Sequence, residues 1–545
     1  MDRQTLLAFL LIGFIIVLYP WYMNIVSPPE LNVVPPSTKP KEVINQNIAP
    51  KKIKAVGVRK LDSIPSKSVS ISTNLYDLTI SNKNGGAFTS FSLYKYQDHN
   101  DNLVNLIDND NSNNMVISFI SIDGDKILLD KNWSMIDNIN SLDVGRGQKS
   151  LTFRTNFSNQ TITKKYTFYA DTYNIDVDVE FEKSSQFISR NQYTLNWNGG
   201  MPATEKNLSN DYLFFEGYAS LGGERIGSKP KKGKSMVENQ NGSTLWSAIK
   251  TKYFISAIIP NEPGVAAQVE SALINEKPTY NTEITQSANS NNRFTVYIGP
   301  LDYDSLSDFN VGLEDNVDLG WALFRPIGQV ISWLLTKMYA IIPNYGLVVI
   351  VFAFLIKLLL NPLTVKTFES TRKMQALAPE IQKLKEKYKN DPQKMSRAQM
   401  ELYKNSGANP LGGCLPMLIQ MPILVSVFSI FRSKIEFRGA PFFGWISDLS
   451  VPDTLISIGS FPINILPVLM GSTMFIQQKM MSAPNADSQQ KTMMYVMNVF
   501  FLFLFYRFPS GLNLYYFIFN LLTILQQKYL MPKPTLSGSA IPIKK

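Results

Sequence analysis

The sequence has a single cysteine, Cys414, and a single histidine, His99, among its 545 residues. A disulfide within one chain needs two cysteines, and a structural zinc site takes four ligands, mostly Cys and His. Catalysis by a Ser-His or Cys-His pair would have to use His99, which lies in an Asn/Asp-rich stretch far in sequence from Cys414. We therefore expect no disulfide, no such metal site, no cofactor and no enzymatic covalent chemistry, and we interpret His99 as a solvated loop residue.

Long apolar runs are nearly absent from residues 24–318 but dominate residues 319–531. The formal net charge of +10 could indicate a nucleic-acid partner, but ten Lys and Arg residues lie in residues 363–413, between two apolar runs. The positive-inside bias of cytoplasmic loops explains such a segment more simply. These features predict a multi-span α-helical membrane protein that also carries a large polar domain.

The first 23 residues predict a membrane anchor. Arg3 precedes an apolar run from Leu6 to Leu18, and aromatic residues follow at Tyr19, Trp21 and Tyr22. A cleaved signal peptide would end in a small-x-small site instead, whereas aromatic residues are typical of the membrane interface. We expect residues 1–23 to be an uncleaved first span with Arg3 in the cytoplasm. Residues 24–67, rich in Pro, Lys, Ser and Asn, predict a flexible linker.

Residues 68–318 have the period-two pattern of β-strands. In Asn174–Glu182 apolar side chains alternate with acidic ones, which gives a strand one apolar and one acidic face. Turn sequences such as Asn84-Gly85-Gly86 and Asn241-Gly242 separate the strand segments. The pattern predicts a large all-β antiparallel sandwich.

The second half predicts an interfacial helix and five further spans. Residues 319–342 are apolar but contain Arg325, Pro326, Gln329 and Lys337, which favours a helix that lies in the membrane interface. Residues 343–362 form the second span, which we expect to end at Pro362. Residues 414–531 hold spans three to six. Span three belongs to the stretch Asn409–Ile430, which begins as a turn, and the later apolar stretches are Phe461–Met481, Thr492–Phe508 and Leu512–Leu530. Six spans place both termini, including the tail 532–545, in the cytoplasm.

Residues 363–413 predict a basic helical hairpin between spans two and three. Apolar residues recur at spacings of three and four from Met374 to Tyr388, and Asp391-Pro392 is a typical helix start. A solvated charged surface explains most of its lysines without any partner. Anionic lipid headgroups and ribosomal RNA are the alternative partners of this surface.

The predicted spans carry polar residues that a simple anchor does not need. Lys357 lies in span two, and Gln420, Asn498 and Asn520 lie in spans three, five and six. A lysine at the bilayer centre costs at least ~2.5 kcal/mol. Lys357 has two interpretations. It lies five residues, about 7.5 Å of helix, from Pro362, so it could extend to the interface; the polar residues of the other spans favour a shared hydrated cavity instead.

The stretch NPLGGCLPMLIQMPI, the stretch from Phe508 to Gln527, and Pro362-Leu363-Thr364 after a basic residue together resemble the YidC family of membrane protein insertases. The resemblance extends to the order of the parts: the first span, a large periplasmic β domain, the interfacial helix, and five further spans with a basic hairpin after the second. The β domain is similar to that of Gram-negative members. In these members the domain resembles the supersandwich of sugar mutarotases. Because this sequence has only one histidine, we do not expect the domain to retain mutarotase catalysis.

The resemblance implies roles for individual residues. The basic groove residue of the family, usually Arg, falls at Lys357, which keeps the charge but not the planar guanidinium fork. Gln420 matches a groove-lining position, and Tyr515 and Tyr516 match paired aromatic residues that face incoming substrate helices. Two weaker candidates for substrate contact are Met470 and Phe505, which are otherwise ordinary core or lipid-facing residues.

These observations predict a membrane protein insertase and chaperone of the inner membrane. A nascent hydrophobic segment would slide along spans three and five into lipid, while its polar flank passes a hydrated cationic groove at Lys357. Nascent membrane proteins and membrane lipids are the expected partners, a Sec-type translocon and the ribosome are further candidates, and no specific nucleic-acid sequence is expected.

Two other functions would account for part of the pattern. A transporter or channel for small anionic solutes would also use an intramembrane cation, but it typically has internal repeats, which this sequence lacks. A membrane-anchored periplasmic enzyme or sugar-binding module would leave five polar-decorated spans unexplained.

Overall fold

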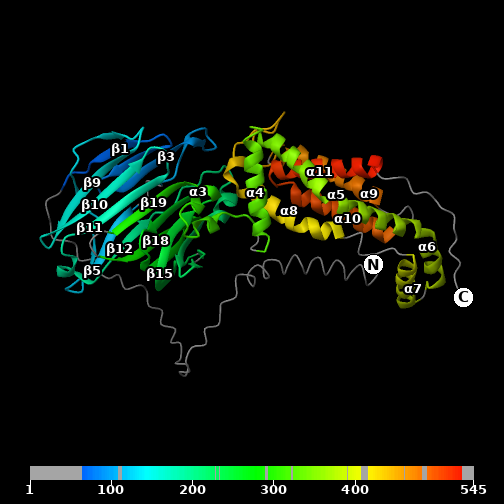
Figure 1. The fold of residues 1–545 in the computed structure, drawn as a ribbon, viewed down its shortest axis with the longest axis horizontal. Helices are drawn as coiled ribbons and strands as arrows, with labels where there is room; N and C mark the ends of the chain where they lie inside the picture. The colour runs from blue at the N-terminus through cyan, green and yellow to red at the C-terminus, as the bar shows by residue number, and fades with distance from the viewer. Residues whose placement is uncertain are drawn as a thin grey trace, which may run out of the picture.

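The structure, a computed structural model, describes residues 64–107, 113–227, 229–231, 233–288, 292–320, 323–389, 391–406, 415–459, 461–481 and 488–530. A β-rich body forms one end of the molecule and a group of helices forms the other (Figure 1). The predicted first span, nearly all of the predicted linker, Cys414 and the tail 532–545 lie outside the described residues.

The β-rich body contains two sheets. The smaller sheet has the strand order β4-β3-β2-β1-β8, and the larger follows the path β6-β5-β12-β18-β17-β15-β16-β19-β11-β10-β9-β7. Strand β13 pairs with β15, and β14 pairs with β13. Among the described strands of these sheets, only β1 and β8 pair in parallel. The smaller sheet comprises β1 Ser68–Ser72, β2 Tyr76–Ser81, β3 Ala87–Gln97, β4 Leu103–Asn105 and β8 Ser141–Asp143. The larger sheet comprises β5 Asn113–Ser121, β6 Lys126–Leu128, β7 Ser134–Met135, β9 Gln148–Phe157, β10 Gln160–Tyr169, β11 Asn174–Phe181, β12 Ile188–Asn198, β13 Glu216–Leu221, β14 Glu224–Ile226, β15 Met236–Lys250, β16 Phe254–Pro260, β17 Gly264–Ile274, β18 Lys277–Ser287 and β19 Asn292–Pro300.

One hydrophobic core joins the two sheets. Ile71 and Phe91 from the smaller sheet and Phe153 and Val177 from the larger belong to the same cluster of buried side chains. The strand predicted at Asn174–Glu182 is β11, and its alternate residues, such as Val177, are buried. The prediction of antiparallel strands with one apolar face is therefore confirmed for this domain. Short helical segments cover the loops of the domain at Ser184–Gln186, Leu208–Asp211, Tyr212–Phe214, Tyr303–Ser307 and Leu313–Asn316.

The helical end contains one helix that lies across the others. Helix α4 (Arg325–Tyr339) crosses the direction in which α5 and α8 to α11 run (Figure 1). These are α5 Tyr345–Ala376, α8 Leu415–Ser433, α9 Ile465–Met481, α10 Ser488–Phe505 and α11 Ser510–Leu525, which continues as a π-helical turn Gln526–Leu530. At the far end lies the pair α6 Ala378–Lys387 and α7 Pro392–Asn405. As predicted, Asp391 caps α7: its carboxylate accepts a hydrogen bond from the Lys394 N–H at 3.0 Å.

Helix α5 does not end at Pro362, where the sequence predicts the end of span two. It runs unbroken to Ala376, so it joins the predicted span to the predicted hairpin. A proline inside a helix removes one hydrogen bond, here the bond to the carbonyl of Leu358, and the rest of the helix can continue. The boundary placed between residues 362 and 363 is therefore not a helix boundary.

The predicted fourth span also starts later than expected. Phe461–Asn464 forms strand β21, which pairs antiparallel with β20 (Thr454–Ile458), and the helix begins only at Ile465. Asp453 fixes this start, because its carboxylate accepts hydrogen bonds from the N–H groups of Ile465 and Leu466 at 3.0 and 2.7 Å. The 17 residues of α9 span about 26 Å, less than the roughly 30 Å of a bilayer core.

By length and composition, one helical stretch among the described residues, Tyr345–Val365, could cross a membrane. A second, shorter apolar helix covers Met494–Phe505. The number of six spans therefore remains a prediction.

The β domain and the helices share a continuous interface. Buried residues of β15 and β19, such as Trp246 and Tyr297, belong to one cluster with Leu335 of α4 and Phe431 of α8. An ion pair crosses the same junction: Arg438 Nε lies 2.8 Å from Glu205 Oε1, and the two side chains are 9% and 16% exposed.

We expect the Arg438–Glu205 pair to show a coupling energy of about 2 kcal/mol in a double-mutant cycle. Removing one partner of a largely buried pair leaves an unpaired charge with little access to water, whereas removing both does not. The measurement is urea unfolding of the full chain in micelles, followed by pulse proteolysis, for Arg438→Ala, Glu205→Ala and the double variant.

The matched control is the exposed pair Arg293–Asp178, whose side chains are 55% and 29% exposed. Its coupling energy should stay below ~1 kcal/mol because exposed pairs contribute little. Equal coupling energies for the two pairs would contradict a role for burial at the junction.

Candidate functional site

Lys357 is a buried cation between α5 and α11. Its side chain is 7% exposed, and its ammonium donates a hydrogen bond to the Thr523 hydroxyl at 2.8 Å. The same ammonium lies 5.1 Å from the centre of the Phe519 ring, within the range of a cation–π interaction. The side chain therefore points toward α11 rather than along its own helix to the interface.

Polar residues continue along this face of α11. Asn520 is 9% exposed and precedes Thr523 by three residues, so the two lie on one face of the helix. The Thr523 hydroxyl donates to the Phe519 carbonyl at 2.7 Å while it accepts from Lys357. Three residues further on, the Gln526 amide donates to the Asn361 side-chain oxygen of α5. We call Lys357, Asn361, Asn520, Thr523 and Gln526 the α5–α11 polar seam.

The seam holds a positive charge, and no described residue pairs a carboxylate with it. Among the ion pairs between described residues, none includes Lys357. A lysine ammonium has three donors, and the described contacts of Lys357 include one hydrogen bond. Such a group can attract a carboxylate or a backbone carbonyl without any covalent step.

The other predicted groove residues lie on different helices. Gln420 is half-buried on α8. Asn498 of α10 donates to Gln478 of α9 at 2.6 Å and to the carbonyl of Met494 at 2.8 Å. The structure thus brings Lys357 and Asn520 to one helix pair, and it links Asn498 to α9 instead.

The paired tyrosines of α11 differ in their surroundings. Tyr515 is fully buried, and its ring contacts Phe352 of α5 at 5.7 Å between centroids. Tyr516 is half-buried and packs edge-on against Phe505 of α10 at 5.6 Å. Both hydroxyl oxygens are inaccessible to solvent and have no hydrogen-bond partner among the described residues. In this conformation Tyr515 packs helices together, and Tyr516 is the more accessible of the two.

Met470 and Phe505 are buried core residues, 2% and 7% exposed. Phe505 also contacts Phe508, with 5.1 Å between ring centroids. These environments match the ordinary core interpretation that the sequence left open for both residues.

Sequence reasoning missed the direct partners of the lysine. Thr523 and Gln526 follow Asn520 at intervals of three residues, a spacing that puts all three on one helical face. This spacing could have identified the polar face of α11. Its pairing with α5 is a contact between residues 166 positions apart, which no local pattern reveals.

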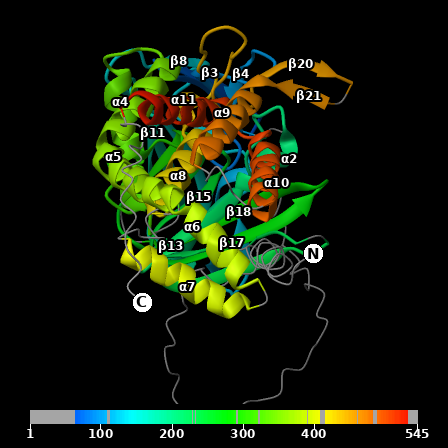
Figure 2. The same cartoon turned by 90° about the vertical axis from the view of Figure 1, so that its right-hand side faces the viewer.

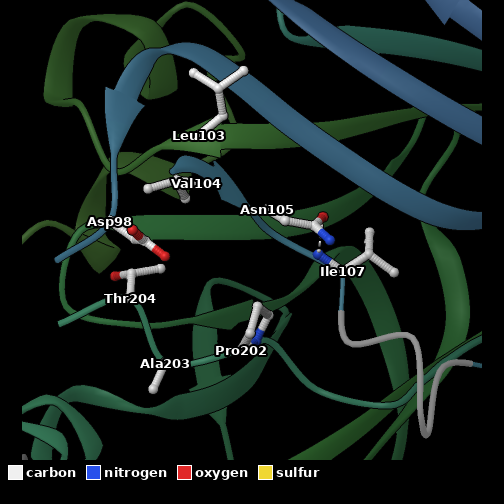
Figure 3. A pocket seen from close by; sticks show the side chains of 8 residues that line it. All are labelled: Asp98, Leu103, Val104, Asn105, Ile107, Pro202, Ala203 and Thr204. Carbon is white, nitrogen blue, oxygen red and sulfur yellow. Dashed lines mark hydrogen bonds between the residues drawn. The ribbon is translucent and has the colours of Figure 1, made fainter. Parts of the chain in front are cut away.

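A hollow among the described residues of the β domain bears on the sugar-binding alternative (Figure 3). Its lining residues are Asp98, Leu103, Val104, Asn105, Ile107, Pro202, Ala203 and Thr204. Its polar side chains already form hydrogen bonds within the domain: Asp98 accepts from two backbone N–H groups, Asn105 accepts from two others, and Thr204 donates to Glu205. A sugar site needs convergent polar groups that are open to a ligand, so this hollow does not favour that alternative.

Comparisons with known proteins cover nearly the whole chain. Residues 68–334 match the family model "YidC periplasmic domain", and residues 337–535 match "60Kd inner membrane protein". The chain is 34% identical over 563 residues to the membrane protein insertase YidC of Chlorobium phaeovibrioides, covering 97% of this chain and 95% of the relative. It is 32% identical over 581 residues to that of Chlorobium luteolum, covering 100% and 99%. A crystal structure of an active YidC insertase aligns with a TM-score of 0.37 and 19% identity, over 87% of this chain and 93% of that one.

The similarity to named insertases extends over the full length of the chain, and the two family models follow each other along it, the periplasmic domain first and the inner-membrane region second. The chain belongs to the YidC family of inner-membrane protein insertases.

Proposed function

We propose that this insertase uses the α5–α11 polar seam as a cationic, hydrated groove for the polar flank of a nascent hydrophobic segment. The observation that carries the proposal is the buried Lys357 ammonium, which is bound to Thr523 and has no described carboxylate partner. A polar or acidic flank that enters lipid directly loses its water without compensation. A nearby cation and amide groups offset part of that loss, so they lower the barrier while burial of the apolar segment drives insertion.

The proposed route runs along the outside of α8 and α10. Phe503 of α10 is 82% exposed and Met421 of α8 is 42% exposed, which leaves apolar side chains for an arriving helix. The pair α6–α7 would receive the chain on the cytoplasmic side. This arrangement requires six spans with both termini in the cytoplasm, and a Sec-type translocon or the ribosome as optional partners.

The experiment that tests the proposal is insertion by the purified full chain in liposomes, combined with cross-linking. In a Cys414→Ser background, single cysteines at Gln420 and Phe503 should form disulfides with a cysteine in the hydrophobic segment of a stalled substrate. The physical reason is that both positions lie on the proposed route.

The matched control is a cysteine at Leu359, which is 71% exposed on α5. It should cross-link to lipid-soluble reagents but not to the substrate. Equal cross-linking of the substrate at Leu359 and Gln420 would contradict the route, and failure of the unmodified chain to insert any substrate would contradict the insertase activity itself.

A further inference from the structure

The hairpin formed by β20 and β21 is an apolar projection between α8 and α9. Residues 454–464 contain no charged side chain. Figure 2 shows the two strands extending beyond the body of the molecule at the upper right. Leu455, Ile456, Ile458 and Phe461 are between 48% and 68% exposed. A soluble loop would not normally present four large apolar side chains to water without a partner.

The strand register collects most of these side chains on one face. Ile456 pairs with Ile463 and Ile458 pairs with Phe461, and residues opposite each other in an antiparallel pair share a face. Ser457 pairs with Pro462 on the other face. One face of the hairpin is therefore entirely apolar.

The base of the hairpin is held firmly against the helix ends. The Asn464 side chain donates to the Tyr506 carbonyl at 2.7 Å, and the Tyr506 hydroxyl donates to the Pro462 carbonyl at 2.6 Å. The rings of Phe461 and Tyr506 are stacked, with 5.6 Å between centroids. Asp453, which caps α9, also accepts a hydrogen bond from the Trp445 indole at 3.0 Å. The apolar face consequently keeps a fixed position relative to α9 and α10.

The hairpin lies at the same height along the helices as α4. The hairpin and α4 lie at the same level along the long axis, at the end of the helices that faces the β domain (Figure 1), and on opposite sides of the helices (Figure 2). Helix α4 also exposes apolar side chains, with Val330 and Trp333 63% and 61% exposed. Below the hairpin the apolar surface continues along α9 through Val468, which is 47% exposed.

We propose that the β20–β21 hairpin inserts its apolar face into the periplasmic leaflet of the bilayer, as a second interfacial anchor opposite α4. A lipid surface fits this face better than a protein partner, because the hairpin offers no charge to select a partner and is continuous with the apolar outside of α9. Arg507, exposed in the turn after Tyr506, is placed to contact lipid phosphate. Two anchors on opposite sides would hold the short helix α9 at a fixed depth while substrate passes.

The test measures the depth of the hairpin in the full chain reconstituted into phosphatidylethanolamine–phosphatidylglycerol vesicles. In a Cys414→Ser background, an environment-sensitive NBD probe is attached to a cysteine at Ile458 or Ile456, and lipids with a nitroxide near the headgroup or deep in the chain are added. Because interfacial segments lie roughly 5–10 Å deep, we expect the shallow nitroxide to remove about half of the emission and the deep one to remove less.

Two matched positions make the result specific. Ser457 lies on the opposite face of the hairpin, and Val237, 53% exposed on β15, lies in the β domain. Weaker quenching at Ser457 and none at Val237 would support insertion of one face. The inference is overturned if aqueous iodide quenches the probe at Ile458 as strongly as the probe at Val237, or if the lipid nitroxides quench the probes at Ile456, Ser457 and Ile458 alike. It is also overturned if the lipid nitroxides do not quench the hairpin probes and energy transfer occurs between differently labelled copies, which would identify a second copy as the partner.

Discussion

Lys357→Glu is expected to reduce the insertion rate of a substrate with an acidic or polar flank by at least about tenfold, which needs a barrier increase of only about 1.4 kcal/mol. Lys357→Arg should retain most of the activity, and Lys357→Ala should lie between the two. The measurement is the initial rate of insertion of a small single-spanning protein into liposomes that contain the purified variants.

The expected order follows from the surroundings of the ammonium. Lys357 is 7% exposed and its described contacts are neutral, namely the Thr523 hydroxyl and the Phe519 ring. At an effective dielectric constant of about 20, two unit charges 4 Å apart interact by about 4 kcal/mol. Reversing the charge therefore turns attraction of an acidic flank into repulsion of similar size. Arg preserves the attraction but needs more space beside Phe519.

Lys373→Glu provides the control, because Lys373 is exposed on the same helix. This variant should insert the substrate at a rate close to that of the unmodified chain. If Lys357→Glu and Lys357→Ala also inserted it normally, charge in the seam would have no role for that substrate, and insertion would depend on hydration and local thinning of the bilayer.

Local sequence patterns predicted several elements well. The alternation in β11 and the cap at Asp391 each depend on residues within one element, and both are confirmed. Lys357 could be identified from the sequence because a charged side chain within an apolar run costs free energy in the membrane, whichever way the side chain points. The full-length resemblance supplied the family, which the comparisons show.

The features that the sequence did not predict depend on contacts between distant residues. Phe461–Asn464 is continuous in sequence with the apolar run of the predicted fourth span, and its pairing with Thr454–Ile458 makes it a strand. A proline predicts a helix end from local geometry, yet α5 continues through Pro362 with only one hydrogen bond removed. The contact between Lys357 and Thr523 joins two helices whose positions depend on the whole fold.

Lys164→Met is expected to destabilise the β domain, and to do so more strongly at pH 9 than at pH 6. Lys164 is fully buried on β10, where its ammonium donates to the carbonyls of Asn84, at 2.8 Å, and Met115. Both of these residues have positive φ, so their carbonyls lie outside the regular strand pairing. A buried carbonyl that loses its donor costs roughly 1–3 kcal/mol, and methionine provides no donor for either.

The pH dependence follows from the titration of the same group. Burial lowers the pKa of Lys164 to about 7 from its ordinary value of 10.5. Between these values the unfolded chain holds a proton that the folded chain has released, so the stability of the unmodified domain rises with pH across this window and lacks this contribution below it. From pH 7 to pH 9, two pH units, the rise amounts to roughly 3 kcal/mol, and the variant loses this rise. The destabilisation by Lys164→Met should therefore be larger at pH 9 than at pH 6 by about that amount.

The adjacent residue supplies a matched control, because Lys165 is exposed on the same strand. Urea unfolding of the full chain in micelles, measured by pulse proteolysis of the β domain at pH 6 and pH 9, should give a nearly constant and small effect for Lys165→Met. Destabilisation of equal size at both pH values for Lys164→Met would mean that the buried amine does not change protonation in this range. In that case only the two carbonyl hydrogen bonds would explain why a lysine occupies the core of this domain.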